Sequence, residues 1–87
     1  MPHFTVRVFV TLKPSVFDPQ GRTIVESLHG LGYAGIADVR QGKYFEVQAD
    51  AADSAAAEAL VREVAGKLLA NPVIESFRLE TPAPVAR

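Results

Sequence analysis

The sequence predicts an α/β (α+β) fold built as a two-layer sandwich, in which two helices cover one face of a mostly antiparallel sheet. Apolar residues alternate with other residues over positions 4–12, which is the period of a half-buried strand. Positions 19–31 and 53–70 carry apolar stripes at helical spacing. A chain of 87 residues has room for one hydrophobic core, so we expect a single domain over residues 1–80. The predicted order is strand, helix, long bent strand, helix and strand.

The composition excludes several classes of protein. A hydrophobic content of 48 % argues against a disordered chain. Nine basic and ten acidic residues give a net charge of −1, which provides neither a basic field for nucleic acid nor a polybasic patch for a membrane. The absence of cysteine excludes disulfides, thiolate nucleophiles and cysteine-based metal sites. No signal-peptide layout is visible, and no apolar run approaches the roughly 18 residues of a membrane span, so we expect a cytoplasmic protein.

The first strand is expected over residues 4–12, where every even residue is apolar. Side chains alternate between the two faces of a strand, so these residues share the face that points to the core. Phe9 is the exception, because it places an aromatic ring on the outer face. A single exposed aromatic is common in soluble proteins, and the alternative is a contact with a second chain. The predicted core-facing residues are Phe4, Val6, Val8, Val10 and Leu12.

A turn and a helix follow this strand. Pro14 ends the strand because proline lacks the N–H that a sheet ladder requires. Asp18 is expected at the N-cap of the helix, where its carboxylate accepts a free backbone N–H, and Pro19 is expected at the first helical position. The helix is predicted to run from about residue 19 to residue 31. Its apolar stripe comprises Ile24, Val25, Leu28 and Leu31.

Residues 36–50 allow two arrangements. Gln41 and Gly42 could form the two-residue turn of a hairpin. A single strand, bent or bulged near Gly42, separates apolar from polar side chains better than the hairpin does. We therefore expect one strand, which at ~3.3 Å per residue would extend over ~45 Å. A domain of this size cannot cover such a strand alone, so the far half needs a partner, most simply a second copy of the chain.

The rest of the chain predicts a second helix over residues 53–70 and a last strand over residues 73–80. Residues 81–87 contain two prolines and no period, so a flexible C-terminal tail is expected. The expected apolar face of the second helix comprises Ala57, Leu60, Val61, Val64 and Leu68. Pairs of opposite charge four residues apart, typical of a solvated helix face, are Glu58–Arg62 and Glu63–Lys67.

No constellation of reactive side chains is visible. His3 and His29 are not spaced with carboxylates as metal ligands are, so we expect them at the surface. The serines lie in no nucleophile motif, and the glycines follow a helix instead of forming a phosphate-binding loop after a strand. The acidic residues are scattered, and no general acid–base pair stands out. The sequence predicts no catalytic, cofactor-binding or metal-binding residue in this chain.

Two stretches remain as candidate sites. A helix N-terminus that follows a strand can bind an anion, but the carboxylate of Asp18 at that position would compete with a phosphate. The stretch RQGKY at residues 40–44 could bind phosphate, or it could protect an exposed strand edge from aggregation. For both stretches an edge or an interface with another chain is favoured over a ligand site.

Three motifs of the sequence match a known family in order along the chain. They are VTLKPSVFDPQG at residues 10–21, DVRQGKY at residues 38–44 and KLLANPVIE at residues 67–75. Each motif alone is weak, whereas three in order in a chain of this length are specific. By these motifs the sequence resembles the PurS family, the small subunit of phosphoribosylformylglycinamidine synthase, over about residues 4–80.

The resemblance implies a subunit that joins a glutaminase, PurQ, and an ATP-dependent synthetase, PurL. Such a complex converts formylglycinamide ribonucleotide, glutamine and ATP to formylglycinamidine ribonucleotide, glutamate, ADP and phosphate in de novo purine synthesis. ATP, Mg and glutamine would be used by the complex, with no cofactor in this chain. The small subunit of the family carries no known catalytic residue and is thought to bridge the other two and to assist ammonia transfer. Family members form dimers or tetramers, which agrees with the argument from the long strand.

Carried over onto matching positions, the resemblance assigns seven residues to contact between subunits and to the shaping of loops. The alternative function is an ACT-like regulatory domain that binds a small molecule, which a true hairpin at residues 41–42 would favour. A dimer and a tetramer stay equally open. The seven predicted interface residues are Lys13, Asp18, Gln20, Gly21, Arg40, Gly42 and Lys43.

Overall fold

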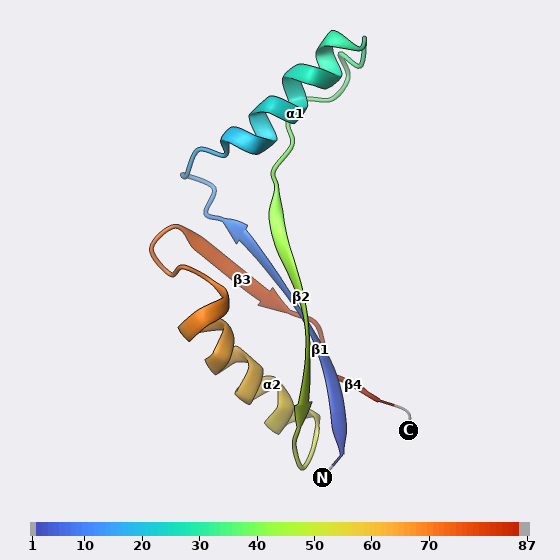
Figure 1. Ribbon diagram of the computed structural model, residues 1–87, viewed down its shortest axis with the longest axis vertical. Helices are drawn as coiled ribbons and strands as arrows, with labels where there is room; N and C mark the ends of the chain where they lie inside the picture. The colour runs from blue at the N-terminus through green and yellow to red at the C-terminus, as the bar shows by residue number, and fades with distance from the viewer. Residues whose placement is uncertain (1, 86–87) are drawn as a thin grey trace.

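An antiparallel sheet forms the body of the molecule (Figure 1). The structure is a computed structural model and describes residues 2–85. Strand β1 (His3–Leu12) is central and pairs along most of its length with β2 (Gly42–Asp50). Strands β3 (Glu75–Leu79) and β4 (Ala83–Pro84) pair with different parts of β1. All of these pairings are antiparallel, and together with the two helices they confirm the predicted α+β class.

The register of the strands separates a core face from an outer face. Val6 of β1 lies opposite Val47 of β2. Val8 lies between Phe45 of β2 and Leu79 of β3. Because side chains alternate along a strand, the even residues of β1 share the core face, as predicted. The fully or nearly buried residues of β1 are Phe4, Val6, Val8 and Val10.

Helix α2 (Ser54–Val64) packs against the core face of the sheet and continues as a π-helical segment, η1 (Ala65–Leu69). Its start is capped by Asp53, whose side chain accepts a hydrogen bond from the N–H of Ala56 at 2.8 Å. The buried side of the helix repeats at every fourth residue, as expected for one face of a helix. Its buried residues are Ala57, Val61 and Ala65.

Two residues of the predicted apolar face of this helix are exposed instead. Leu60 exposes 44 % of its surface and Leu68 exposes 81 %. Leu60 lies to one side of the buried row. Leu68 lies in η1, where the N–H of Ala70 bonds to the carbonyl of Ala65 at 3.0 Å and the turn is wider than in an α-helix. The prediction is wrong for Leu68 because it assumes a regular α-helix up to residue 70. It is wrong for Leu60 because the buried face of α2 is narrower than the predicted stripe.

Helix α1 (Pro19–Gly30) occupies a different place from the one that the sequence predicts. The sequence places it on the sheet beside α2, but it lies beyond the end of the sheet (Figure 1). Its predicted stripe is largely uncovered, since Ile24 is 40 % and Leu31 is 75 % exposed, whereas Val25 is buried. The structure corrects this placement because α2 alone covers the narrow core face, and the chain after β1 leads away from it.

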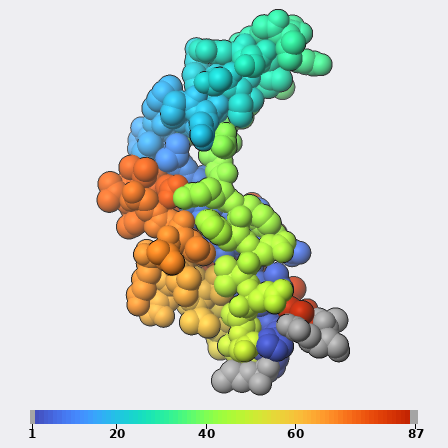
Figure 2. All heavy atoms as spheres, viewed as in Figure 1, coloured from blue at the N-terminus to red at the C-terminus, as the bar shows by residue number. Residues whose placement is uncertain are grey.

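The molecule is elongated as a result. Its principal extents are 52 × 30 × 14 Å, and its radius of gyration is 16.7 Å. A compact domain of this length has a radius of gyration of about 12 Å. Figure 2 shows α1 standing away from the rest of the chain. The hydrophobic core therefore lies between the sheet and α2, and α1 projects from it.

Residues 36–50 do not form one continuous paired strand. Strand β2 begins at residue 42, and residues 36–41 before it have no strand partner in the described part of the chain. The chain passes through Gln41 and Gly42 without a hairpin, as the separation of faces predicts. The feature that would favour an ACT-like domain is therefore missing. The unpaired half is the part for which the sequence predicts a partner chain.

The last long strand is shorter than the sequence predicts, and the segment after it is paired with the sheet. The last predicted strand, residues 73–80, is confined to β3. Residues 81–85 are predicted as part of a flexible tail, but β4 pairs with the start of β1, and the N–H of Val85 donates to the carbonyl of His3 at 2.9 Å. The prolines of this segment were taken as a sign of a flexible tail, but proline can lie at the edge of a sheet. Residues 86–87 are outside the described part.

Candidate functional site

The residues predicted for subunit contact gather at one end of the sheet, where β1 ends and where α1 and β2 begin (Figure 1). We call this region the junction and define it as residues 13–21 and 39–43. The junction is formed by two passages of the chain that are far apart in sequence. It contains all seven predicted residues: Lys13, Asp18, Gln20, Gly21, Arg40, Gly42 and Lys43.

Asp18 is buried in the junction, with 5 % of its surface exposed. Its Oδ1 accepts a hydrogen bond from the N–H of Gly21 at 2.9 Å, which confirms its predicted N-cap position. Its Oδ2 accepts another from the N–H of Gln41 at 2.6 Å. The Gln41 amide first, and the Gly21 amide second, lower the pKa of Asp18 because both bonds favour the ionised carboxylate. A phosphate at this helix N-terminus would meet a negative charge already in place.

Arg40 binds the other passage of the junction. Its Nη2 donates to the carbonyl oxygen of Lys13 at 3.1 Å and to that of Val16 at 2.9 Å. Main-chain carbonyls outside regular structure need such donors. The guanidinium is therefore engaged within its own chain, whereas the sequence assigns it to contact with another subunit. The backbone of Lys13 is also fixed, because its N–H donates to the carbonyl of Ile74 at 2.9 Å.

Two glycines permit a close approach of backbones in the junction. A Cβ on Gly21 would overlap the carbonyl of Val39. A Cβ on Gly42 would lie 2.5 Å from the carbonyl oxygen of Val10, closer than real Cβ atoms come. A larger residue at Gly21 would push the two passages apart, and a larger residue at Gly42 would push β2 away from β1. The role in loop shaping that the sequence assigns to these glycines stays a prediction.

Lys43 pairs with Glu75, a residue that sequence reasoning missed. The Nζ of Lys43 lies 3.3 Å from Oε2 of Glu75, and the N–H of Asn71 donates to Oε1 at 2.7 Å. The Asn71 amide is the largest cause that lowers the pKa of Glu75, and Lys43 adds to it. Lys43 and Glu75 lie on the two strands that flank β1, opposite Val10 and Leu12. The pair becomes predictable once the strand order β2-β1-β3 is known.

A small cavity of about 180 Å³ opens between these residues. Both carboxylates in its wall already have two partners each, so neither is free to act as a general base. Its volume is below the roughly 300–1,000 Å³ of typical small-molecule sites. The cavity therefore carries no catalytic interpretation. Its lining includes Asp18, Gln20, Gly42, Lys43 and Glu75.

A cluster of aromatic and charged side chains lies on the outer face of the sheet. The ring centroids of Phe9 and Tyr44 are 5.1 Å apart, and the guanidinium of Arg78 lies 4.1 Å from the centre of the Phe9 ring. The Tyr44 hydroxyl accepts a hydrogen bond from Nε of Arg7 at 3.0 Å and donates one to Oε1 of Glu46 at 2.9 Å. Phe9 is thus covered by neighbours in its own sheet, and its aromatic ring does not require a second chain.

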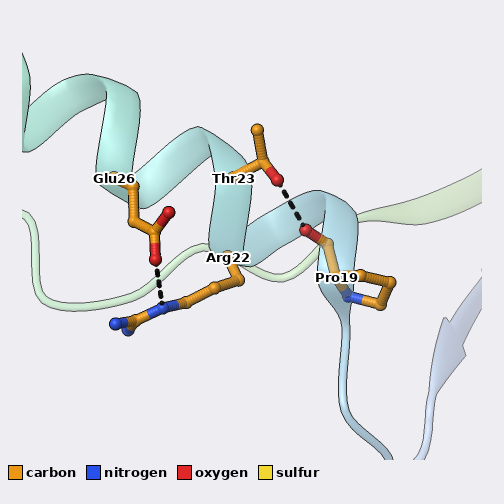
Figure 3. A network of polar contacts seen from close by, with 4 residues as sticks. All are labelled: Pro19, Arg22, Thr23 and Glu26. Carbon is orange, nitrogen blue, oxygen red and sulfur yellow. Dashed lines mark hydrogen bonds and ion pairs between the residues drawn. The ribbon is translucent and has the colours of Figure 1, made fainter.

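The first turns of α1 make local polar contacts (Figure 3). Nε of Arg22 donates to Oε1 of Glu26 at 3.0 Å, and Oγ1 of Thr23 donates to the carbonyl of Pro19 at 3.0 Å. Each contact joins residues four positions apart on the same helix. These contacts stabilise α1 internally and do not attach it to the sheet.

The other ionisable groups of the described residues offer no further site. His3 is half-buried and paired with Asp50, whereas His29 is exposed, as predicted, and its Nε2 lies 2.7 Å from the carbonyl oxygen of Ile36. Within residues 2–85 no three potential ligands gather as a metal site. In the same part of the chain no helix is long and apolar enough to cross a membrane. The hydrogen bonds and ion pairs of the junction are better suited to holding chain segments in position than to catalysing a reaction.

Comparison with known proteins identifies relatives of this chain. The family model described as PurS: Phosphoribosylformylglycinamidine (FGAM) synthase matches residues 5–83. The chain is 44 % identical over 84 residues to phosphoribosylformylglycinamidine synthase subunit PurS of Bacillus subtilis (strain 168), which covers 97 % of this chain and 99 % of the relative. It is 44 % identical over 77 residues to the PurS subunit of Synechocystis sp., which covers 88 % of this chain and 77 % of the relative.

Solved structures agree with this assignment. PurS of Thermus thermophilus is similar with a TM-score of 0.85 and 34 % identity, over 98 % of this chain and all (100 %) of that one. A chain of the PurLQS structure from Thermotoga maritima is similar with a TM-score of 0.85 and 29 % identity, over 92 % of this chain and 98 % of that one. Because the family model spans nearly the whole sequence and the Bacillus subtilis relative is similar over nearly its full length, this chain belongs to the PurS family.

Proposed function

We propose that this chain is the small assembly subunit of phosphoribosylformylglycinamidine synthase, which joins the synthetase PurL and the glutaminase PurQ. The observation that carries the proposal is the similarity to a chain of the PurLQS structure, with a TM-score of 0.85 over 98 % of that chain. In this complex, formylglycinamide ribonucleotide, glutamine and ATP are converted to formylglycinamidine ribonucleotide, glutamate, ADP and phosphate. The complex acts in de novo purine synthesis in the cytoplasm.

The chemistry belongs to the partners in this proposal. The two carboxylates that line the cavity, Asp18 and Glu75, are held by backbone amides and by Lys43, which leaves them unsuited to proton transfer. The sequence has no cysteine to serve as the nucleophile of a glutaminase. ATP, Mg and glutamine are therefore assigned to PurL and PurQ. This chain bridges them and assists the transfer of ammonia.

A second copy of the chain is part of the proposal, and the exposed surface supports it. The chain exposes 5954 Å². A folded monomer of 9.4 kDa exposes about 5000 Å². The excess of roughly 900 Å² is close to the ≈ 800 Å² that each partner buries in a standard interface. The unpaired residues 36–41 lie in the same region as the apolar side chains that α1 and its neighbouring loops leave exposed: Phe17, Ile24, Leu31, Tyr33 and Ile36.

The bridging role is tested by size-exclusion chromatography of this chain with PurL and PurQ, with and without glutamine and Mg-ADP. We expect the three proteins to migrate together in at least one condition. In activity assays, product formation from glutamine should require this chain, whereas product formation from ammonium by PurL should not. That difference separates bridging and ammonia transfer from an effect on PurL itself. Failure to migrate together in either condition would count against the proposal.

The predicted interface residues are tested in the same assay. Lys13→Glu and Lys43→Glu reverse charges in the junction, and Lys67→Glu reverses a charge on η1, outside the junction. We expect the first two variants to weaken assembly and the third to leave it unchanged, provided that circular dichroism shows all three to be folded. Undiminished assembly in both junction variants would remove these lysines from the interface.

A further inference from the structure

The α1 helix and the loop after it form an arm that is joined to the rest of the molecule through two passages of the chain. We define the arm as residues 19–38, the outgoing passage as residues 13–18 and the returning passage as residues 39–41. The sheet and α2 form the body. Figure 2 shows the arm standing away from the body, with the returning passage as a narrow neck. The direction of the arm therefore depends on how these two passages are held.

Apolar packing contributes little to holding the arm. The buried residues of α1 are Gly21 and Val25, and Gly21 has no side chain. The buried row of α2, in contrast, packs against β1 and β2. Stabilisation by burial scales with the apolar area removed from water. A segment that buries so little is expected to move relative to its neighbours unless directional contacts restrain it.

Directional contacts are concentrated where the two passages meet. Asp18 in the outgoing passage accepts a hydrogen bond from the N–H of Gln41 in the returning passage at 2.6 Å. Arg40 in the returning passage donates to the carbonyls of Lys13 and Val16 in the outgoing passage at 3.1 and 2.9 Å. Each passage thus contributes one charged side chain that binds the backbone of the other. Hydrogen bonds with an ionised partner are stronger than neutral ones.

We propose that Asp18 and Arg40 form a clasp that fixes the direction in which the α1 arm leaves the body. Both are positioning residues, because they act by holding backbone segments together. With the clasp closed, the outgoing passage cannot slide or twist past the returning one. If the contacts of either Asp18 or Arg40 are lost, the arm is joined to the body mainly by the main chain of the two passages. The inference concerns the chain itself and does not depend on PurL, PurQ or the proposed function.

A simpler explanation is that Asp18 serves as an ordinary helix cap. Asp53 provides the comparison, because it caps α2 through the N–H of Ala56 and, among residues 2–85, its side chain bonds no distant segment. Serine also caps helices, but its side chain is too short to reach two segments at once. Asp18→Ser therefore keeps the cap and removes the bond to Gln41. Asp53→Ser is the matched control on the other helix.

Arg40→Lys opens the other half of the clasp. Lysine keeps the positive charge, but its ammonium nitrogen ends one bond short of the position of Nη2, the nitrogen of Arg40 that donates to both carbonyls. A change of arm direction in this variant would therefore be caused by geometry and not by charge. Arg40 is exposed, so its replacement leaves the core intact. The proposal can therefore be tested with this variant even if Asp18→Ser fails to fold.

The direction of the arm is measured as the distance between spin labels on Ser27→Cys in α1 and Ala59→Cys in α2. Both positions are exposed, and the chain has no other cysteine. Dilution of labelled chain with an excess of unlabelled chain isolates distances within one molecule. Amide exchange of Gln41 is followed in parallel by NMR. The bond to Asp18 has a charged acceptor, so its loss should accelerate that exchange about 10- to 100-fold.

We expect a broader distance distribution in Asp18→Ser and in Arg40→Lys, and an unchanged one in Asp53→Ser. Amide protection in β1 should stay as it is in the parent chain, which separates release of the arm from general unfolding. An unchanged distribution in the clasp variants that fold would overturn the proposal. So would equal broadening in Asp53→Ser, because the effect would then follow from the loss of any helix cap.

Discussion

Helices α1 and α2 begin in the same way but are held in place by different forces. Asp18 caps α1 by accepting from Gly21, and Asp53 caps α2 by accepting from Ala56. Helix α2 then buries a row of small apolar side chains against the sheet. Helix α1 buries little and relies on hydrogen bonds between the passages that lead to it. Capping and apolar periodicity specify that a helix forms, but they do not specify the surface against which it packs.

The difference assigns different roles to the two helices. The surface of α2 that faces the sheet completes the core of this chain. The stripe of α1 leaves Ile24 and Leu31 exposed, so it provides apolar area for another chain. An amphipathic stripe left uncovered in one chain is therefore a sign of assembly, which agrees with the proposed second copy.

The largest expected effect comes from placing a negative charge on α2. Val61 is 1 % exposed where α2 meets the sheet, so Val61→Asp buries a carboxylate without a partner. We expect the free energy of unfolding to fall by about 3–5 kcal/mol, a large part of the stability of a small domain. Urea unfolding followed by circular dichroism measures this loss.

The same substitution on α1 sharpens the comparison. Ile24 is 40 % exposed, so the charge of Ile24→Asp stays in contact with water. We expect the free energy of unfolding to fall by less than about 1 kcal/mol. Self-association, measured by analytical ultracentrifugation, should weaken instead. Equal losses of stability in the two variants would show that α1 is held by its apolar stripe after all.

A second pair of variants compares a crowded glycine on α1 with an open one after α2. Helix propensity alone favours alanine over glycine, so Gly21→Ala would be stabilising if nothing lay nearby. Because its Cβ would overlap the carbonyl of Val39, we expect destabilisation by about 1–3 kcal/mol instead. Gly66→Ala has open space and should stabilise by up to about 1 kcal/mol.

Thermal unfolding of both glycine variants gives the sign of each effect. Opposite signs at Gly21 and Gly66 would confirm that the junction, and not helix propensity, governs the start of α1. Stabilisation at both positions would contradict the close packing of the two passages.

Features that depend on neighbours in sequence could be predicted from the sequence. The N-cap role of Asp18 follows from the Asp-Pro pair at the start of an apolar stripe. The core face of β1 follows from strict alternation, and the parity of apolar residues favoured a single strand over a hairpin at Gln41 and Gly42. Two of the three sequence motifs also contain the seven predicted interface residues, and the structure brings these residues together in the junction.

Features that depend on distant segments could not be predicted in this way. The partners of Arg40 are main-chain carbonyls of a loop, which carry no sequence signal. Glu75 meets Lys43 across β1, so its role requires the strand order. The apolar stripe of α1 looks the same whether this chain or another covers it. Leu68 was misplaced because a π-helical segment has no reliable signature in one sequence.

Acid sensitivity provides a third comparison, between Asp18 in the junction and Glu75 at the start of β3. The pKa of Asp18 is lowered by the Gln41 amide, and that of Glu75 by the Asn71 amide, from ordinary values of 3.8 and 4.5. Since both folded values lie below the unfolded ones, the stabilisation is fully present above the unfolded values and is lost as the pH falls through the folded values. We expect the free energy of unfolding to decrease from about pH 5 downward.

Variants separate the two carboxylates in this experiment. Asp18→Asn and Glu75→Gln each remove one titrating group, and urea unfolding at a series of pH values should show a shallower decrease for each. Both carboxylates line the same cavity, so we expect their effects to be coupled, and the double variant measures that coupling. An unchanged pH dependence in the double variant would mean that other carboxylates govern the acid response.

The smallest expected effects concern ion pairs on the solvent side of each helix. Arg22 and Glu26 on α1 are 3.0 Å apart (Figure 3), and Glu58 and Arg62 on α2 are 3.9 Å apart. Both pairs are well exposed, so Glu26→Gln and Glu58→Gln should each reduce the free energy of unfolding by less than about 0.5 kcal/mol. Both differences should vanish in about 1 M salt, where screening acts within ~3 Å. A loss above about 1 kcal/mol for Glu26→Gln alone would show that surface charges on α1 contribute to holding the arm, and the clasp would then share that role.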